Sequence, residues 1–124
     1  MAERTLNKVY GKLKCAIVRP SIIISSYQEP LPGWTDTISA GGGIAVGVAV
    51  GLMRVVQCGH NARVDLVPAD YVVNLIITSG FFVAQESEPC LKIVSAGSSH
   101  LNPVTPQMFL RDILDYAASN PFEN

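Results

Sequence analysis

The chain has 124 residues, 15% of them charged, a net charge of −1 and a mean hydropathy of +0.30. It contains no basic run, which excludes the usual surface for nucleic acid or an anionic membrane. An ordinary soluble domain carries about 25% charged residues, so an apolar excess of this size needs an explanation. Three interpretations fit: a membrane span, an obligate partner, or a piece of a larger core.

A membrane span is excluded by length. The longest apolar tract, Tyr71–Ala84, is interrupted by polar side chains and is shorter than the roughly 20 residues needed to cross a bilayer. The scattered cysteines Cys15, Cys58 and Cys90 are typical of reduced thiols in an intracellular protein. We therefore favour a piece of a larger core.

In chain order, apolar spacing predicts a helix over 2–10, a strand over 14–18 and a helix over 44–56. Gly11 should end the first helix, and residues 19–39 should be irregular. The strand is apolar on both faces, as are strands buried in a parallel sheet. The first half of the chain therefore predicts one central strand between two helices.

The second half predicts an extended piece over 64–67 and a helix over 68–84, with Asp70 near the positive end of the helix. This helix is apolar nearly all round, which predicts that it is buried. A second buried strand is expected over 91–95. Thr105-Pro106 predicts a helix start, with threonine as N-cap and proline as the first helical residue.

Two strands and at least three apolar helices do not make a closed parallel sheet, because parallel strands need neighbours on both edges and helices on both faces. The pattern predicts an α/β protein: the carboxyl-terminal portion of a doubly wound, Rossmann-like parallel sheet. Residues 1–124 are interpreted as a fragment of a single domain.

The turn Arg19-Pro20-Ser21-Ile22 follows the first strand directly. Open α/β sheets bind ligands at the carboxyl ends of their strands. Proline fixes φ and removes a donor, which shapes such a turn. The turn is therefore a candidate ligand site, and an ordinary strand-to-loop connection is the alternative.

Five stretches, in this order, resemble the fatty acyl-CoA reductases of the extended short-chain dehydrogenase/reductase superfamily. They are Ala2-Glu3, Ala16–Ile22, Glu29–Trp34, Asp65–Asn74 and Asn102–Thr105. The most family-specific of these is the run Glu29-Pro30-Leu31-Pro32-Gly33-Trp34.

The resemblance implies a domain that binds NAD(P) and substrate, in a reductase that converts long-chain acyl-CoA to fatty alcohol with NADPH. It assigns cofactor-binding roles to Arg19, Pro20, Ser21 and Ile22, and substrate-binding roles to Gly33 and Trp34. Trp34 could instead pin its loop to the fold, since an aromatic ring offers a large apolar area.

The same resemblance places the glycine-rich dinucleotide loop and the catalytic Tyr-x-x-x-Lys pair upstream of Ala2. No catalytic residue and no metal ligand are therefore assigned here, and this chain alone is expected to be inactive. Its expected partners are acyl-CoA and the remainder of the reductase or partner subunits. An intracellular site, at peroxisomal or endoplasmic reticulum membranes, is expected from the family. The alternative is a non-catalytic remnant that serves as a structural or interaction subunit of a larger complex.

Two local patterns imitate functional motifs. Tyr10 and Lys14 have Tyr-x-x-x-Lys spacing, but Gly11 should break the helix that this chemistry needs. The run Gly41–Gly47 misses the phosphate-binding G-x-G-x-x-G pattern by one residue. Its glycines, continued at Gly51, indicate close helix packing or a flexible wall near an acyl chain.

Asp65 and Asp70 invite a paired-carboxylate interpretation, in which they would perform acid–base chemistry. The competing interpretation is structural. Asp70 would stabilise the start of its helix, and Asp65 would tie down a loop.

Overall fold

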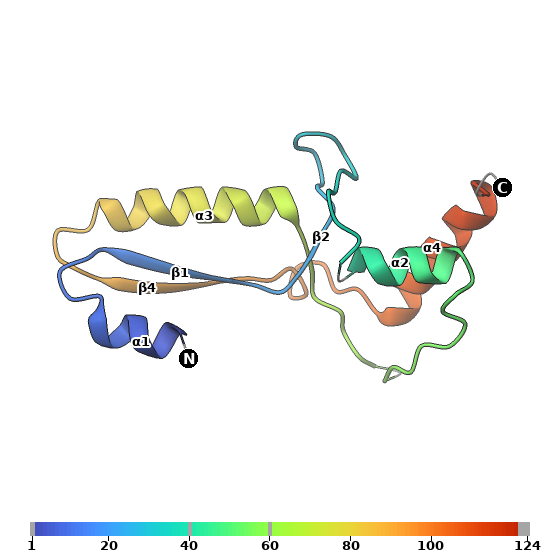
Figure 1. The fold of residues 1–124 in the computed structure, drawn as a ribbon, viewed down its shortest axis with the longest axis horizontal. Helices are drawn as coiled ribbons and strands as arrows, with labels where there is room; N and C mark the ends of the chain where they lie inside the picture. Colours follow the sequence, from blue (N-terminus) through green and yellow to red (C-terminus); the bar gives the residue numbers. More distant parts are fainter. Residues whose placement is uncertain (1, 40, 60, 122–124) are drawn as a thin grey trace.

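The computed structural model describes residues 2–39, 41–59 and 61–121. It has an elongated shape with a group of elements at each end (Figure 1). At one end the parallel strands β1 (Cys15–Pro20) and β4 (Leu91–Ala96) lie between α3 (Ala69–Ala84) and α1 (Ala2–Val9). This end is the α/β part of the fold.

At the other end α2 (Gly41–Ala49) packs on α4 (Pro106–Ser119). The strands β2 (Ile22–Ile24) and β3 (Leu66–Pro68) form a second parallel pair that joins the two ends. The helix α3 contacts strands of both pairs.

The register of the first pair sets the position of the ligand edge. Cys15 lies opposite Leu91, and Pro20 lies opposite Ala96. Because the strands are parallel, their carboxyl ends meet at one edge. From this edge β1 continues directly into β2, so the second pair begins where the first ends.

These elements confirm an α/β fold with parallel strands and helices, in agreement with a partial Rossmann-like sheet. The predicted start of α4 is also confirmed. The Thr105 hydroxyl accepts the Met108 N–H at 3.2 Å, and Pro106 is the first helical residue. Within the described ranges, none of the helices has both the length and the apolarity needed to cross a membrane.

The hydrophobic core is small. Its connected cluster is Val67, Val72 and Ala96, with Leu75 packed against it, and the other buried apolar side chains of the described residues are Val48, Leu66 and Val83. The prediction that α3 is buried all round is wrong in this structure, since Ile77 is 64% and Phe81 69% exposed. A sheet of two strands covers only one stripe of a helix, so the opposite face of α3 stays open.

The two sheet strands are also less buried than their apolar sequences predict. β1 is half-buried over Cys15–Val18, and Ile93 of β4 is 53% exposed. Each strand pairs along one edge within the described chain, and α1 contributes no fully buried side chain to their other face. The strands are parallel and apolar, but they lack the flanking layers that would bury them.

Several boundaries differ from the predictions, and β1 extends to Pro20, two residues beyond the predicted end of the strand. The stretch 19–39 contains the short strand β2, which is recognised only through its pairing with β3. The helix α2 begins at Gly41 and ends at Ala49, and Gly51 follows with a left-handed φ of 73°. Pro68 is the N-cap of α3 with extended angles, so it lies one residue outside the helix.

Candidate functional site

The turn at the carboxyl end of β1 is held by backbone hydrogen bonds to both strand pairs. Ser21 N–H donates to the Ala96 carbonyl at 2.9 Å, and Ile22 N–H donates to the Asp65 carbonyl at 3.1 Å. The Ser21 hydroxyl is buried and has no hydrogen-bond partner within the described ranges. A buried hydroxyl normally has a partner, so this oxygen is available to a polar ligand group.

Arg19, in β1 two residues before Ser21, forms a bidentate ion pair with Glu3 of α1. Its Nε donates to Glu3 Oε1 at 2.8 Å, and its Nη2 donates to Glu3 Oε2. This contact lowers the pKa of Glu3 and raises the pKa of Arg19, mainly through the side-chain hydrogen bond. The Arg19 side chain therefore ties α1 to the sheet. Of the predicted turn, Arg19 and Pro20 belong to β1 and Ile22 begins β2, so only Ser21 lies between the two strands.

The conspicuous run of prolines belongs to a closed loop over residues 26–34. Ser26 N–H donates to the Trp34 carbonyl at 3.0 Å, and Gly33 N–H donates to the Ser26 carbonyl at 2.8 Å. Gly33 has a φ of 80°, a left-handed angle that favours glycine. Figure 1 shows this 26–34 loop projecting from the body of the molecule above β2.

The carboxylate of Asp70, at the start of α3, holds one side of the 26–34 loop. It accepts the N–H groups of Tyr27, Gln28 and Glu29 at 3.0, 2.9 and 3.2 Å. The Tyr27 bond contributes most to lowering the pKa of Asp70 to about 2, and burial opposes it. Asp70 is therefore ionised at neutral pH and cannot act as a proton donor there.

Asp65 has the same kind of role on the turn after β4. Its Oδ1 accepts the Ser98 N–H at 2.7 Å and the Ser99 N–H at 2.9 Å, and these bonds, led by that from Ser98, lower its pKa. A Cβ on Gly97 would lie 2.6 Å from Asp65 Oδ2. The structural interpretation of Asp65 is confirmed, because this carboxylate ties down a loop. Asp70 also anchors a loop, whereas the prediction placed its role at the start of its own helix.

A cavity of about 650 Å³ lies between β2, the end of the 26–34 loop, α2 and the start of α4. Ile23 and Ile24 of β2 form one wall and continue directly from the turn at Ser21. Trp34 and Gly33 form another wall. This volume is in the usual range for a small-molecule site, and an apolar lining with few polar groups is typical of such sites. The structure thus brings the two predicted substrate residues to a cavity next to the predicted cofactor turn.

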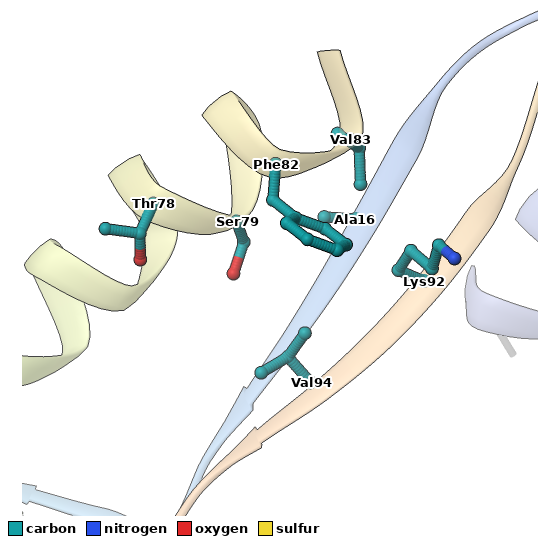
Figure 2. Close-up of a pocket in the computed structure, with 7 residues that line it drawn as sticks. All are labelled: Ala16, Thr78, Ser79, Phe82, Val83, Lys92 and Val94. Carbon is teal, nitrogen blue, oxygen red and sulfur yellow. The ribbon is translucent and has the colours of Figure 1, made fainter. Parts of the chain in front are cut away.

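A smaller hollow of about 260 Å³ lies beneath α3 (Figure 2). Phe82 and Val83 descend from α3 toward Ala16 of β1, with Lys92 and Val94 of β4 across from them. The Lys92 ammonium is paired with Glu86 at 3.0 Å and lies 6.0 Å from the centroid of the Phe82 ring. This hollow is at the amino ends of the strands, away from the ligand edge, and we interpret it as a packing gap.

The backbone conformation shows that neither of the two motif-like patterns forms the functional motif it imitates. α1 ends at Val9 and Gly11 has a φ of 54°, so Tyr10 and Lys14 do not share a helical face. Lys14 Nζ donates instead to the Ala84 carbonyl at the end of α3. Gly41–Gly47 lies within α2, where it packs on β2 and α4. No group of three potential metal ligands occurs in the described part of the chain.

Comparisons with known proteins agree with this architecture. An NAD-binding family model described as "Male sterility protein" matches residues 1–76. Fatty acyl-CoA reductase 2 of Mus musculus is 32% identical over 124 residues, which are 100% of this chain and 24% of that protein. Fatty acyl-CoA reductase 1 of Homo sapiens is 32% identical over 103 residues, covering 83% of this chain and 20% of that protein.

The parallel strands and the family match define the class: an α/β protein of an NAD-binding family. More narrowly, it belongs to the male sterility protein family and is similar to the fatty acyl-CoA reductases, as its motifs indicated. The chain spans about a quarter of the length of the curated relatives it matches.

Sequence reasoning missed two features of this site. It assigned Asp70 to its own helix, whereas the structure uses this carboxylate to hold Tyr27, Gln28 and Glu29 as well. It also missed Gly97, whose missing side chain lets Asp65 approach. An aspartate at a helix start looks the same in sequence in either role, so only the fold distinguishes them.

Proposed function

We propose that this chain supplies the cofactor-side turn and the acyl-binding wall of a fatty acyl-CoA reductase, which reduces long-chain acyl-CoA to fatty alcohol with NADPH. The observation that carries the proposal is the apolar cavity at Trp34, which adjoins the Ser21 turn at the carboxyl ends of the strands. Family membership supports the use of a nicotinamide cofactor.

The residues of the turn fit the nicotinamide end of such a cofactor. The Ser21 hydroxyl is a buried polar atom without a partner among the described residues, and a carboxamide is a group that it could hydrogen-bond. When bound, the cofactor supplies the hydride, and the protein supplies binding and orientation. In this proposal Pro20 shapes the turn, Ser21 holds the carboxamide, and Trp34 with β2 orients the acyl chain and excludes water.

We further propose that the chain works as part of a larger reductase and is inactive alone. β1 pairs only with β4 along its length, so its other edge is open within the described ranges. A hollow of about 590 Å³ runs along that edge, lined by Val18 and by Ile76 and Gly80 of α3. These surfaces are suited to further strands and helices of the same sheet. A location at peroxisomal or endoplasmic reticulum membranes is part of the same proposal and rests on the resemblance alone.

A direct test replaces the matching segment of the Mus musculus reductase with this chain. We expect the folded chimera to oxidise NADPH in the presence of palmitoyl-CoA, and this chain by itself to show no micromolar NADPH binding in isothermal titration. In the chimera, Ser21→Ala should raise the KM for NADPH by about twofold to tenfold, as expected for one lost hydrogen bond. The matched variant Ser119→Ala, at the far end of α4, should leave it unchanged.

The competing function is a non-catalytic subunit whose open apolar surface is covered by other proteins. The exposed side chains Ile77 and Phe81 of α3 favour a covering partner of some kind. A folded chimera that binds NADPH but does not reduce palmitoyl-CoA would support this alternative. Micromolar NADPH binding by the chain alone would refute the proposal that the rest of the reductase is needed to bind the cofactor.

A further inference from the structure

Gly42, in the first turn of α2, is a glycine that the fold itself does not require. A Cβ at Gly41, Gly43 or Gly47 would meet a neighbouring atom at 3.0 Å or less. At Gly42 the nearest atom would be the Thr37 carbonyl oxygen at 3.7 Å, an ordinary contact, and its φ is not in the left-handed region. Alanine forms helices better than glycine does, so neither packing nor backbone conformation accounts for this residue.

The position of Gly42 supplies a reason. Gly42 and Ala45 both line the 650 Å³ cavity, on the α2 side, and Trp34 and Ile23 line it from other elements. A glycine lets a ligand approach the backbone closely, and a nearby alanine adds only a methyl group. Near these two positions the cavity is bounded by little more than helix backbone.

We propose that Gly42 and Ala45 determine substrate specificity: the small size of both residues sets the length of linear acyl chain that the cavity accepts. The inference rests on the proposed function, because it takes the acyl group as the ligand of this cavity. The recognised chemistry is an unbranched hydrocarbon, which suits the mainly apolar surface of the cavity. The polar residues of the lining are Ser25, Thr35, Asp36, Thr37 and Ser39.

The expected effect follows from the carbon atoms that a new side chain displaces. Each methylene that can no longer be buried weakens binding about fourfold. Leucine at position 42 adds four carbons, so it should exclude about three methylenes and weaken palmitoyl-CoA binding on the order of 50-fold. Octanoyl-CoA, whose chain is shorter, should bind almost as it does to the unmodified chain.

Gly42→Ala separates this role from a structural one. The added methyl group improves the helix, so the melting temperature should stay equal or rise. The same methyl group occupies the cavity, so palmitoyl-CoA binding should weaken about fourfold. A purely structural role for Gly42 would not move stability and affinity in opposite directions.

The experiment titrates the intact chain with octanoyl-, lauroyl- and palmitoyl-CoA below their critical micelle concentrations. Trp34 is the single tryptophan of the sequence and lines the cavity, so its fluorescence reports binding. The variants are Gly42→Ala, Gly42→Leu and Ala45→Leu. Two matched controls lie outside the cavity: Gly59→Leu in a loop and Ala118→Leu on an exposed face of α4.

The inference holds if the cavity variants weaken palmitoyl-CoA selectively and the controls do not. If unmodified chain binds acyl-CoA and the variants leave its chain-length preference unchanged, the inference is wrong while the proposed acyl site stands. If the unmodified chain binds none of the three ligands, the same variants are compared in the chimera with the Mus musculus reductase, and a folded chimera that also binds none of them shows that both are wrong. Should Gly42→Leu fail to fold, Gly42→Ala and Ala45→Leu decide the outcome, since each is a smaller change.

Discussion

Alanine substitutions at three glycines of α2 test the packing of this helix. The gain in helix propensity is the same for all three, but the contacts of the new Cβ differ. At Gly42, Gly43 and Gly47 the change to alanine should stabilise the helix by about 0.5–1 kcal/mol. The contacts that each new Cβ would make are different. The three variants should therefore differ in stability for reasons of tertiary structure alone.

The new Cβ of Gly42→Ala would make only an ordinary van der Waals contact. This variant should therefore keep the full stabilisation from helix propensity, which corresponds to a rise in melting temperature of about 3 °C. Gly43→Ala would place its Cβ 2.6 Å from the Ile38 carbonyl oxygen. That oxygen belongs to the backbone, so the chain must shift, and overpacking of this kind costs about 1–3 kcal/mol. The net change in the free energy of unfolding should be a loss of up to about 2.5 kcal/mol.

Gly47→Ala lies between these cases. Its Cβ would approach Met53 Sδ at 2.9 Å, but this side chain is 38% exposed and can rotate away. Met53 has flexible torsions that adapt to such changes, so the free energy of unfolding should stay within about 0.5 kcal/mol of that of the parent chain. The predicted order of stability is Gly42→Ala, then Gly47→Ala, then Gly43→Ala.

The assay is thermal and urea-induced unfolding followed by circular dichroism, with all three variants and the parent chain measured together. If Gly43→Ala proves as stable as Gly42→Ala, α2 does not lie against Ile38 as described. If the free energy of unfolding rises equally in all three variants, only helix propensity matters, and the packing argument for these glycines fails.

Two further predictions concern the anchored loop and the open face. Backbone N–H groups lower the pKa of Asp70 from 3.8 to about 2, so its stabilising contribution should be fully present above about pH 4 and disappear as the pH falls through about 2. Asp70→Asn should be less stable at neutral pH and lose this acid dependence, measured through Trp34 fluorescence; an unchanged pH profile would contradict the anchoring role. Phe81→Ser on the exposed face of α3 should change the free energy of unfolding, measured by urea-induced unfolding, by less than about 0.5 kcal/mol. Val72→Ser, at a buried position, is the contrast, and equal destabilisation by both variants would refute the described exposure of α3.

Much of the secondary structure could be predicted from sequence because local physics determines it. Thr105-Pro106 starts α4 as predicted, since a threonine cap and a proline at the first helical position satisfy local requirements. The apolar residues of β1 and β4 predict both strands, although Lys92 and Ser95 interrupt the apolar run of β4. β2 was not predicted, because three residues have no periodicity of their own and need the pairing with β3 to define them.

Two features of the candidate site could be predicted from the sequence: the class of protein, from its motifs, and the ligand edge, from the direction of the strands. The order of the family-like stretches identified the NAD-binding class, and the polar turn after β1 identified the ligand edge. The roles of Arg19, Pro20, Ser21, Ile22, Gly33 and Trp34 in binding remain predictions. The cavity beside Trp34 could not be inferred, since its walls come from four segments that only the fold brings together.

The sequence by itself determined the class of protein, the helices with strong caps and the apolar strands, because these depend on neighbours along the chain. Tertiary structure alone decided what the charged groups do. Asp70 binds amides 41 to 43 residues away, and Asp65 binds amides 33 and 34 residues away. It also decided that one face of α3 stays open. The chemical type of a side chain determines which hydrogen-bond partners it can have. Only the fold of the backbone determines which of these partners lie close enough to bond.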